Sequence, residues 1–453
     1  MNIIIVGCGK VGEALAEQLN EEGSNITVID LNADRVHDVS SKYDVMGVIG
    51  NGATHAILME ADIKHCDLLI AVTGSDELNL LCCLIAKKAG NCQTIARVRS
   101  PEYSVEAPYL KDELGLAMVI NPEFTAASEI ARVLRFPSAM KIDTFAKGRV
   151  EMMKFRLPEN SPIIGCAVKE LAGKFRCDVL ICTVEREDEA FIANGDFVFE
   201  EKDVISLIAT PKNANDFFRK INYKMNSVKD VMIIGGGEIS HYLCQILKRS
   251  GGGISIKIIE KDLKRCEELS AELEDVRIIH GDAAEQALLM EEGLENAGGF
   301  IALTNLDEEN IFLSLFAKRV TDGKLVTKIN RIDFDDVIKH LDLDTIIYPK
   351  NITSETIARY VRAMKNTIGS NVETLYSIVK GKIEAAEFSI KDGSPIVGIP
   401  LSKLHLKPNV LIAAILRGRT VITPHGNDEI QAGDSVVIVS GHTEMHDITD
   451  ILK

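Results

Sequence analysis

Three glycines near the start of the chain have the spacing of a phosphate-binding turn. Gly7, Gly9 and Gly12 form the pattern G-x-G-x-x-G directly after the apolar run at residues 2–6. In such a turn the first glycine permits the tight bend, the second lets the backbone approach a pyrophosphate, and the third allows close packing of helix on strand. The N–H groups at the start of the following helix would hold the anion. The pattern therefore predicts a nucleotide site.

An acidic residue stands where the ribose of that nucleotide would lie. Asp30 follows 18 residues after Gly12, at the end of the second apolar run. Its carboxylate would accept hydrogen bonds from ribose hydroxyls and would repel a 2′-phosphate. The first half of the chain therefore favours NAD or an adenosine nucleotide over NADP. A purely structural glycine turn is the alternative.

The same landmarks return in the second half of the chain. VMIIGGGEIS (residues 231–240) repeats IIIVGCGKVG (residues 3–12), and Glu260 takes the place of Asp30. The third glycine is replaced by Ser240, whose side chain we expect to crowd the contact between helix and strand. A glycine run at residues 251–253 lengthens the next turn and could shift Glu260. A second nucleotide site and a vestigial one both remain open.

The elements around these residues alternate between strand and helix patterns. Later landmarks also match, as at residues 50–63 with 281–294 and 68–79 with 299–310, and a proline-initiated helix closes each copy at Pro122 and Pro349. This alternation predicts an α/β fold with two doubly wound parallel sheets of the Rossmann type. Short alternating apolar runs follow each copy and predict a small α+β domain there.

The chain is therefore expected to contain four domains. The predicted boundaries are residues 1–122 and 228–348 for the two nucleotide-binding domains, and residues 140–223 and 370–453 for the two small domains. A polar linker is expected around residues 212–229.

Further candidates lie where other strands of the first sheet end. Thr73 and Gly74 are expected to line the nucleotide pocket, with an ordinary strand cap as the alternative. Arg97 and Arg99 could pair with a phosphate, and a domain-interface ion pair is the alternative for Arg97. The counterparts of the two arginines are Lys328 and Asn330.

Two other groups of polar residues are expected to have structural roles rather than to bind a ligand or a metal. Asp76 and Glu77, like Asp307 and Glu308, are expected to begin helices, where acids suit the dipole. His442 and His446 have the spacing of two metal ligands on one helix face, but no third ligand is evident, so a solvated helix is expected.

Composition narrows the class of protein. The net charge is −16, whereas a protein that binds nucleic acid presents a basic surface to the phosphates, so no nucleic acid is expected as a partner. No apolar run is long enough to cross a bilayer and no signal peptide is evident, which favours the cytoplasm. The ten scattered cysteines are expected to be reduced and mostly buried.

With these motifs in tandem, the chain resembles the TrkA family over essentially its whole length. The family comprises peripheral, nucleotide-binding regulatory subunits of Trk-type potassium uptake systems, built from two regulator-of-potassium-conductance (RCK) domains. The resemblance implies a first nucleotide site at Gly7, Cys8, Gly9, Lys10, Val11, Gly12, Asp30, Thr73, Gly74 and Arg97. It implies a second at Gly235, Gly236, Gly237, Glu238, Ile239 and Glu260.

The resemblance also implies partners and ligands. NAD or NADH is expected, and ATP or ADP is possible in the same turns. The chain is expected to form a homo-oligomeric ring, a tetramer, on the inner face of the membrane, and to gate a membrane-embedded potassium-translocating subunit there. No catalytic or metal-ligating residue is expected.

Two rival functions stay open from the sequence. An NAD-dependent oxidoreductase would need a proton-relay residue and a substrate pocket, usually from a dedicated second domain. The two small domains are too alike to suggest such specialisation. Regulation of a different cation transporter by the same module is the other rival.

Overall fold

The computed structural model describes residues 1–100, 103, 106–136, 140–145, 149–187, 189–223, 228–249, 253–330, 337–338, 341, 343–367, 372–379, 382–441, 445 and 447–453. Residues 251 and 252 of the glycine run, residue 370 and both histidines of the candidate pair, His442 and His446, lie outside this set.

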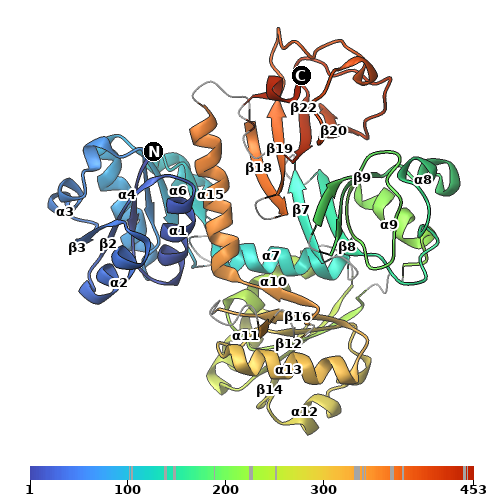
Figure 1. Ribbon diagram of the computed structural model, residues 1–453. Coiled ribbons are helices and arrows are strands. Elements are labelled where there is room, and N and C mark those ends of the chain that lie inside the picture. Colours follow the sequence, from blue (N-terminus) through green and yellow to red (C-terminus); the bar gives the residue numbers. More distant parts are fainter. Residues whose placement is uncertain are drawn as a thin grey trace. The chain divides into compact units, whose positions relative to one another are not determined.

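The first half forms a six-stranded parallel sheet between two layers of helices. Its elements are β1 (Asn2–Val6), α1 (Lys10–Glu21), β2 (Asn25–Asp30), α2 (Ala33–Tyr43), β3 (Met46–Ile49), α3 (His55–Glu60), a 3-10 turn (Ile63–His65), β4 (Leu68–Ala71), α4 (Asp76–Gly90), β5 (Gln93–Arg97), α6 (Ala107–Leu114), β6 (Met118–Ile120) and α7 (Pro122–Arg135). The strand order is β3-β2-β1-β4-β5-β6. Helices α1 and α2 pack together on one face, and α3 and α4 on the other (Figure 1).

This order places the glycine turn at the point where the sheet reverses direction. β1 pairs in parallel with β2 on one side and with β4 on the other. Ligands of such sheets bind outside the carboxyl ends of the strands at this switch point. Leu15, Ala16 and Leu19 of α1 are fully buried, which fixes the helix that leaves the turn.

The second half repeats the first. Its elements are β12 (Asp230–Ile234), α10 (Glu238–Arg249), β13 (Ser255–Glu260), α11 (Leu263–Glu272), β14 (Val276–His280), α12 (Gln286–Glu291), a 3-10 turn (Leu294–Asn296), β15 (Gly299–Ala302), α13 (Asp307–Val320), β16 (Lys324–Lys328), β17 (Thr345–Ile347) and α15 (Pro349–Thr367). The order β14-β13-β12-β15-β16-β17 is the same as in the first sheet. The predicted pair of doubly wound sheets is confirmed, as are the helices that begin at Pro122 and Pro349.

Each doubly wound sheet is followed in sequence by an antiparallel sheet. The first small sheet contains β7 (Lys141–Phe145), β8 (Val150–Arg156), β9 (Leu180–Arg186), β10 (Glu189–Ile192) and β11 (Val204–Ala209), with helices α8 (Val168–Phe175) and α9 (Pro211–Lys220). The second contains β18 (Val372–Val379), β19 (Ile383–Ser389), β20 (Val410–Arg417), β21 (Thr420–Ile422) and β22 (Ser435–Ser440), with 3-10 turns at Leu401–Lys403 and Ile448–Ile451. The expected small α+β followers are therefore present.

The start of the expected polar linker is a helix instead. Residues 211–220 form α9, and Phe217 and Phe218 on it are buried in the core of the first small sheet with Phe155. The sequence looked linker-like because the other positions of this helix are polar. Its apolar positions are few but are large aromatics, so their burial suffices to hold the helix.

The chain divides into two compact units, each made of two segments. One unit contains residues 1–131 and 228–358, which hold both parallel sheets, and the other contains residues 132–227 and 359–453, which hold both antiparallel sheets. Within the second unit a single core cluster joins the two antiparallel sheets, with Met152 and Ile208 from one and Ala385 and Val437 from the other. The two parallel sheets therefore share one unit, and the two antiparallel sheets share the other.

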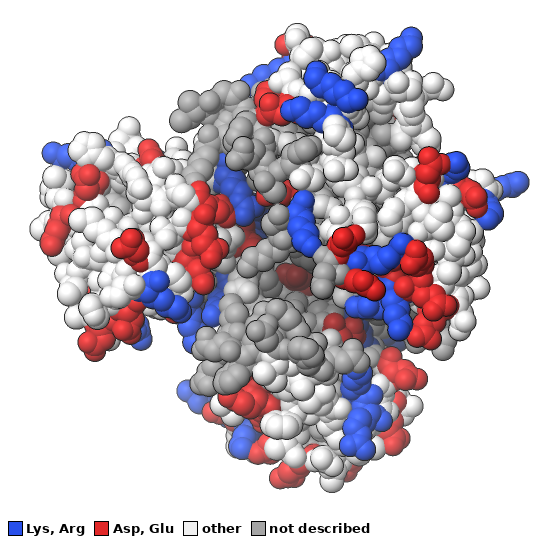
Figure 2. Space-filling model, in the orientation of Figure 1, with Lys and Arg blue, Asp and Glu red and all other residues white. Residues whose placement is uncertain are grey.

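The surface and the cysteines complete this description. Acidic and basic side chains are interspersed on the face drawn in Figure 2. Among the described residues no helix is long and apolar enough to cross a membrane. All ten cysteines are free, and all but the half-buried Cys177 are buried, as the sequence predicted.

Candidate nucleotide-binding sites

The first glycine turn requires glycine at two of its three positions. Gly7 has φ +108°, and a Cβ there would lie 3.0 Å from the backbone of Val72 and Thr73. A Cβ on Gly12 would lie 1.8 Å from the carbonyl oxygen of Gly7, so no side chain fits the turn as it stands.

The middle glycine faces open space. A Cβ on Gly9 would meet no atom within 4 Å. Gly9 is also the N-cap of α1 and provides no side-chain cap for Lys10, Val11 and Gly12 in the first turn of the helix. An uncapped helix start beside open space can accommodate a phosphate group.

Asp30 is bound to the turn through the backbone. Its Oδ2 accepts the N–H of Cys8 at 2.7 Å and its Oδ1 accepts the N–H of Asn32 at 2.9 Å. A carboxylate has about four acceptor positions, so capacity for ribose hydroxyls remains. Burial, with a smaller contribution from Asp30, raises the pKa of the Cys8 thiol to about 12, so this thiol stays neutral.

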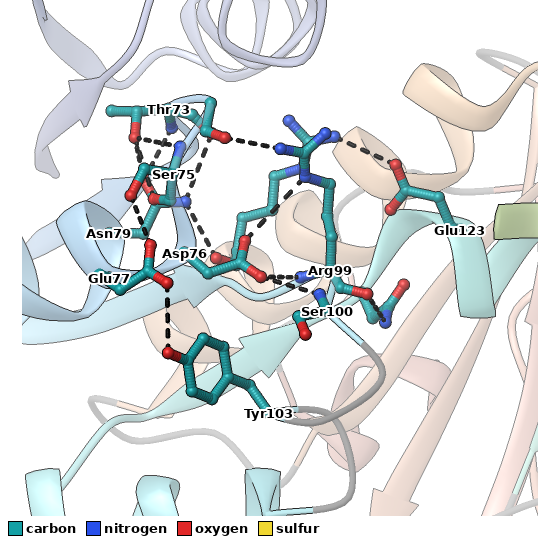
Figure 3. Close-up of polar contacts among 12 residues, drawn as sticks. Thr73, Ser75, Asp76, Glu77, Asn79, Arg99, Ser100, Tyr103 and Glu123 are labelled. Atoms are coloured by element: carbon teal, nitrogen blue, oxygen red, sulfur yellow. Dashed lines mark hydrogen bonds and ion pairs between the residues drawn. The ribbon is translucent and has the colours of Figure 1, made fainter.

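An asparagine that the sequence analysis did not select organises the next two strand ends. Asn79 on α4 is fully buried, and its Oδ1 accepts from the N–H of Thr73 at 2.8 Å and from its hydroxyl at 2.7 Å. Its Nδ2 donates to the carbonyl of Arg97 at 2.9 Å. The same side chain thus holds the ends of β4 and β5 together. Figure 3 shows Asn79 beside Thr73.

Asp76 performs a second positioning task at this edge. It begins α4, as expected, and its Oδ2 accepts the N–H groups of Arg99 and Ser100, each at 2.8 Å. The Arg99 guanidinium donates to the carbonyl of Gly74 at 2.6 Å. Asp76 therefore fixes the backbone of Arg99 and Ser100 shortly after β5, and Arg99 holds the carbonyl of Gly74 (Figure 3).

Arg97 lies in an ion pair within the first unit. Its Nη2 is 3.3 Å from Oε1 of Glu123 on α7, and the side chains are 15% and 20% exposed. Burial lowers the pKa of Arg97, and Nε of Arg97 and Oε2 of Glu123 are buried without a hydrogen-bond partner. The alternative considered from the sequence was an ion pair at a domain interface, whereas this pair joins two residues of the same unit. Contact of Arg97 with a phosphate stays a prediction.

The second glycine turn has the same construction. Gly235 has φ +94°, and Glu260 accepts the N–H of Gly236 at 2.5 Å and the N–H of Asp262 at 2.8 Å. Glu260 therefore stands where Asp30 does, despite the longer preceding turn. Ser240, expected to crowd the contact between helix and strand, is fully buried, and its hydroxyl donates a hydrogen bond to the Gly235 carbonyl at 2.5 Å.

The polar residues around the second glycine turn differ from those around the first. Lys328 is buried, its Nζ lies 3.3 Å from Oδ1 of Asn305, and burial lowers its pKa. Arg265, which the sequence analysis missed, donates from Nε to the Gly236 carbonyl at 2.8 Å and pairs with Glu238 at 3.2 Å. Gly237 faces open space as Gly9 does, and Ile239 is buried on α10.

The positioning residues are repeated as well. Asn310 accepts from Thr304 and donates to the carbonyl of Lys328 at 3.0 Å, as Asn79 does in the first copy. Asp307 accepts the N–H of Asn330 at 3.0 Å, as Asp76 does for Arg99. Their recurrence at matching positions of the repeat is the signal by which the sequence could have revealed them. No cluster of potential metal ligands occurs among the residues that the structure describes.

Comparison with known proteins assigns the family. The TrkA-N domain matches residues 3–122 and 231–349, and the TrkA-C domain matches residues 152–222 and 385–453. The chain belongs to the TrkA family. The Trk system potassium uptake protein TrkA of Vibrio alginolyticus is 32% identical over 97% of this chain and 95% of its own length. A TrkA homolog from Archaeoglobus fulgidus is 31% identical over the full length of both chains.

Solved structures support the RCK fold. The GsuK RCK domain matches with a TM-score of 0.65 and 19% identity, covering 97% of this chain and 92% of that one. The GsuK channel bound to NAD matches with a TM-score of 0.64 and 18% identity, covering 97% and 76%. The predicted tandem RCK architecture and the TrkA resemblance are confirmed. The relatives are potassium uptake proteins and not the oxidoreductases that the glycine turn alone had left open.

Proposed function

We propose that this chain is the nucleotide-binding regulatory subunit of a Trk-type potassium uptake system. It would act at the cytoplasmic face of the membrane and gate a membrane-embedded potassium-translocating subunit. One observation supports this above others. In a TrkA-family chain, both glycine turns are joined by their backbone N–H groups to the acidic residue that would receive a ribose.

The proposed ligands are NAD or NADH, with ATP or ADP as further candidates. The first site would comprise Gly7–Gly12, Asp30, Thr73, Gly74 and Arg97, and the second Gly235–Ile239 and Glu260. The open space at Gly9 and Gly237 and the remaining acceptor capacity of Asp30 and Glu260 fit a nucleotide diphosphate and its ribose. The four-domain division at residues 1–122, 140–223, 228–348 and 370–453 is part of this proposal.

Gating requires the ligand to prefer one conformation of the assembly. A ligand with equal affinity for two states shifts nothing, and its differential affinity limits the shift it can produce. Helices α7 and α15 each begin in the unit with the parallel sheets and end in the unit with the antiparallel sheets. We propose that a ring of four chains transmits the response through these two helices.

Calorimetric titration tests the binding half of this proposal. Wild-type protein is titrated with NAD, NADH, ATP and ADP beside Asp30→Ala and Glu260→Ala, with the exposed Asp38→Ala and Glu274→Ala as matched controls. Each site variant should lose one class of sites, and the controls should retain both. Absence of binding of all four nucleotides to the wild type would overturn the proposal.

Reconstitution tests the transport half. Purified chain is mixed with a Trk-type pore subunit in liposomes, and potassium uptake is measured with and without the nucleotide that binds. Nucleotide should change the uptake rate only when the chain is present. If no complex forms at micromolar concentration, regulation of a different cation transporter becomes the better explanation.

A further inference from the structure

We infer that the two glycine turns of this chain select nucleotides by charge. The first turn binds nucleotides more tightly as their number of phosphates rises, and the second discriminates against added phosphate. The deciding residues are Lys10 in the first copy and Glu238 in the second. The inference rests on the proposed nucleotide binding and names the class of ligand that suits each site. Both residues lie in the unit that contains the two parallel sheets.

The helices that leave the two glycine turns begin with opposite charges. Lys10 is the first residue of α1, and Glu238 is the first residue of α10. Each follows a glycine with open space beside it, Gly9 in the first turn and Gly237 in the second. Both side chains therefore stand at the helix start where a phosphate group would be held.

The helix dipole makes this exchange significant. A glutamate is favourable at a helix start and a lysine is unfavourable, because the dipole places positive charge there. Glu238 thus supplies from within the chain the negative charge that suits α10. Lys10 supplies none to α1, so a phosphate at the first turn pairs with the lysine and with the dipole together.

Arg265 fixes Glu238 at the second turn. Its Nε donates to the carbonyl of Gly236 at 2.8 Å, its Nη2 lies 3.2 Å from Glu238, and its Nη1 lies 3.1 Å from Glu268. The arginine side chain is 23% exposed. Two carboxylates share this one guanidinium, so the cluster stays negative and repels an added phosphate.

The corresponding arginine of the first copy lacks such carboxylates. Arg35 occupies the position of Arg265, since the helix caps Asn32 and Asp262 accept the N–H groups of the two arginines, each at 3.1 Å. Its side chain is exposed, and within the described part of the chain no carboxylate forms an ion pair with it or with Lys10. Both cations are therefore available to a phosphate at the first turn.

The next charged position along each helix does not reverse this difference. Glu13 on α1 is held in an ion pair with Lys42 at 2.9 Å. Its counterpart on α10 is His241, which lies 3.1 Å from Glu272. Each of these groups faces a partner of opposite sign, so the contrast between the two helix starts remains that of Lys10 and Glu238.

Titration with AMP, ADP and ATP measures the selection, because these nucleotides differ only in their number of phosphates. Glu260→Ala leaves the first site alone, and Asp30→Ala leaves the second. Magnesium is omitted, since it would neutralise the phosphates. The first-site protein should bind ATP about tenfold more tightly than AMP, whereas the second-site protein should bind ATP no more tightly than AMP.

Exchange of the two residues should reverse the selection. Glu238→Lys in the second-site protein should raise the ratio of ATP to AMP affinity by about tenfold, and Lys10→Glu in the first-site protein should lower it by about tenfold. Glu268→Lys is the matched control for Glu238→Lys. It removes a partner of the same arginine and is 43% exposed against 45%, but it lies on α11 and not at the turn. It should change the ratio by less than about twofold, as should the exposed Lys64→Glu in the first-site protein.

The outcomes separate this inference from the proposed function. An equal preference for ATP at both sites, or the same change from Glu268→Lys as from Glu238→Lys, overturns the inference. If the second-site protein binds none of the three nucleotides, Glu238→Lys should create ATP binding, and its failure to do so also overturns the inference. A first-site protein that binds NADH but does not prefer ATP to AMP overturns the inference and leaves the proposed function standing. Absence of binding of NADH and of all three adenine nucleotides overturns both.

Discussion

The carboxylate of Asp203 receives the guanidinium of Arg186 through two parallel hydrogen bonds, at 2.8 Å to Oδ1 and 2.9 Å to Oδ2. Asp203 is fully buried, and the arginine side chain is 28% exposed. Arg417 and Asp434 form the same pair in the other antiparallel sheet, at 3.0 and 2.9 Å. Planar two-point pairing of this kind is specific to arginine.

Loss of the buried carboxylate should destabilise the small domains. Asp203→Asn keeps the shape of the side chain but removes the buried charge that pairs with Arg186 and leaves the arginine its ion pair with the exposed Glu200. This loss should lower the free energy of unfolding by about 2–3 kcal/mol. Chemical denaturation followed by circular dichroism measures the change. Asp196→Asn is the control, since Asp196 pairs with Lys169 while 82% exposed, and it should be nearly neutral because water screens the pair. Equal losses in both variants would contradict the argument.

Substitutions at two glycines of the first turn should separate an effect on stability from an effect on nucleotide binding. Gly12→Ala places a Cβ against the Gly7 carbonyl and should cost about 3 kcal/mol of stability. Gly9→Ala meets no atom and should change stability by less than about 0.5 kcal/mol, yet weaken NADH binding at the first site by roughly tenfold. Thermal melts and calorimetry are compared in a Glu260→Ala background. Full NADH affinity in Gly9→Ala would place the ligand away from the turn.

The buried asparagines should matter equally in both copies. Asn79→Ala leaves the N–H of Thr73 and the carbonyl of Arg97 without their partner, and should cost about 2–3 kcal/mol because each buried unsatisfied group carries a penalty. Asn310→Ala should behave alike. The exposed Asn25→Ala is the control and should be nearly neutral. A loss confined to one copy in urea titrations would show that the two networks are not equivalent.

Lys324 should make stability rise with pH in the alkaline range. It is 3% exposed beside Asp344, and burial lowers its pKa below the ordinary 10.5. Between the lowered pKa and 10.5 the unfolded chain binds more protons than the folded one, so this lysine adds stability as pH rises through that window. As the pH rises toward 10.5 through that window, wild type should gain stability relative to Lys324→Met. The exposed Lys64→Met should run parallel to wild type, and a flat difference for Lys324→Met would refute the assignment.

The sequence alone determined the repeat, the fold class and the two glycine turns with their acids. Apolar runs, glycine spacing and helix periodicity are local features. A buried central strand requires a run of apolar residues, and a tight turn requires glycine at fixed positions, so a few consecutive residues suffice to recognise either. Gly7, Gly12, Asp30 and Glu260 could therefore be selected from the printed order of residues. Residues 211–220 were misjudged as linker because their burial rests on Ala214, Phe217 and Phe218 among mostly polar neighbours.

Only the tertiary structure decided which polar groups meet. Asn79 contacts strand ends that lie 6 and 18 residues away in sequence, and Arg97 meets Glu123 across 26 residues. Tyr242 bonds to the carbonyl of Arg99 across 143 residues. Such contacts depend on how strands are ordered in a sheet and how the two halves of the repeat pack, and nothing in a local pattern records that packing.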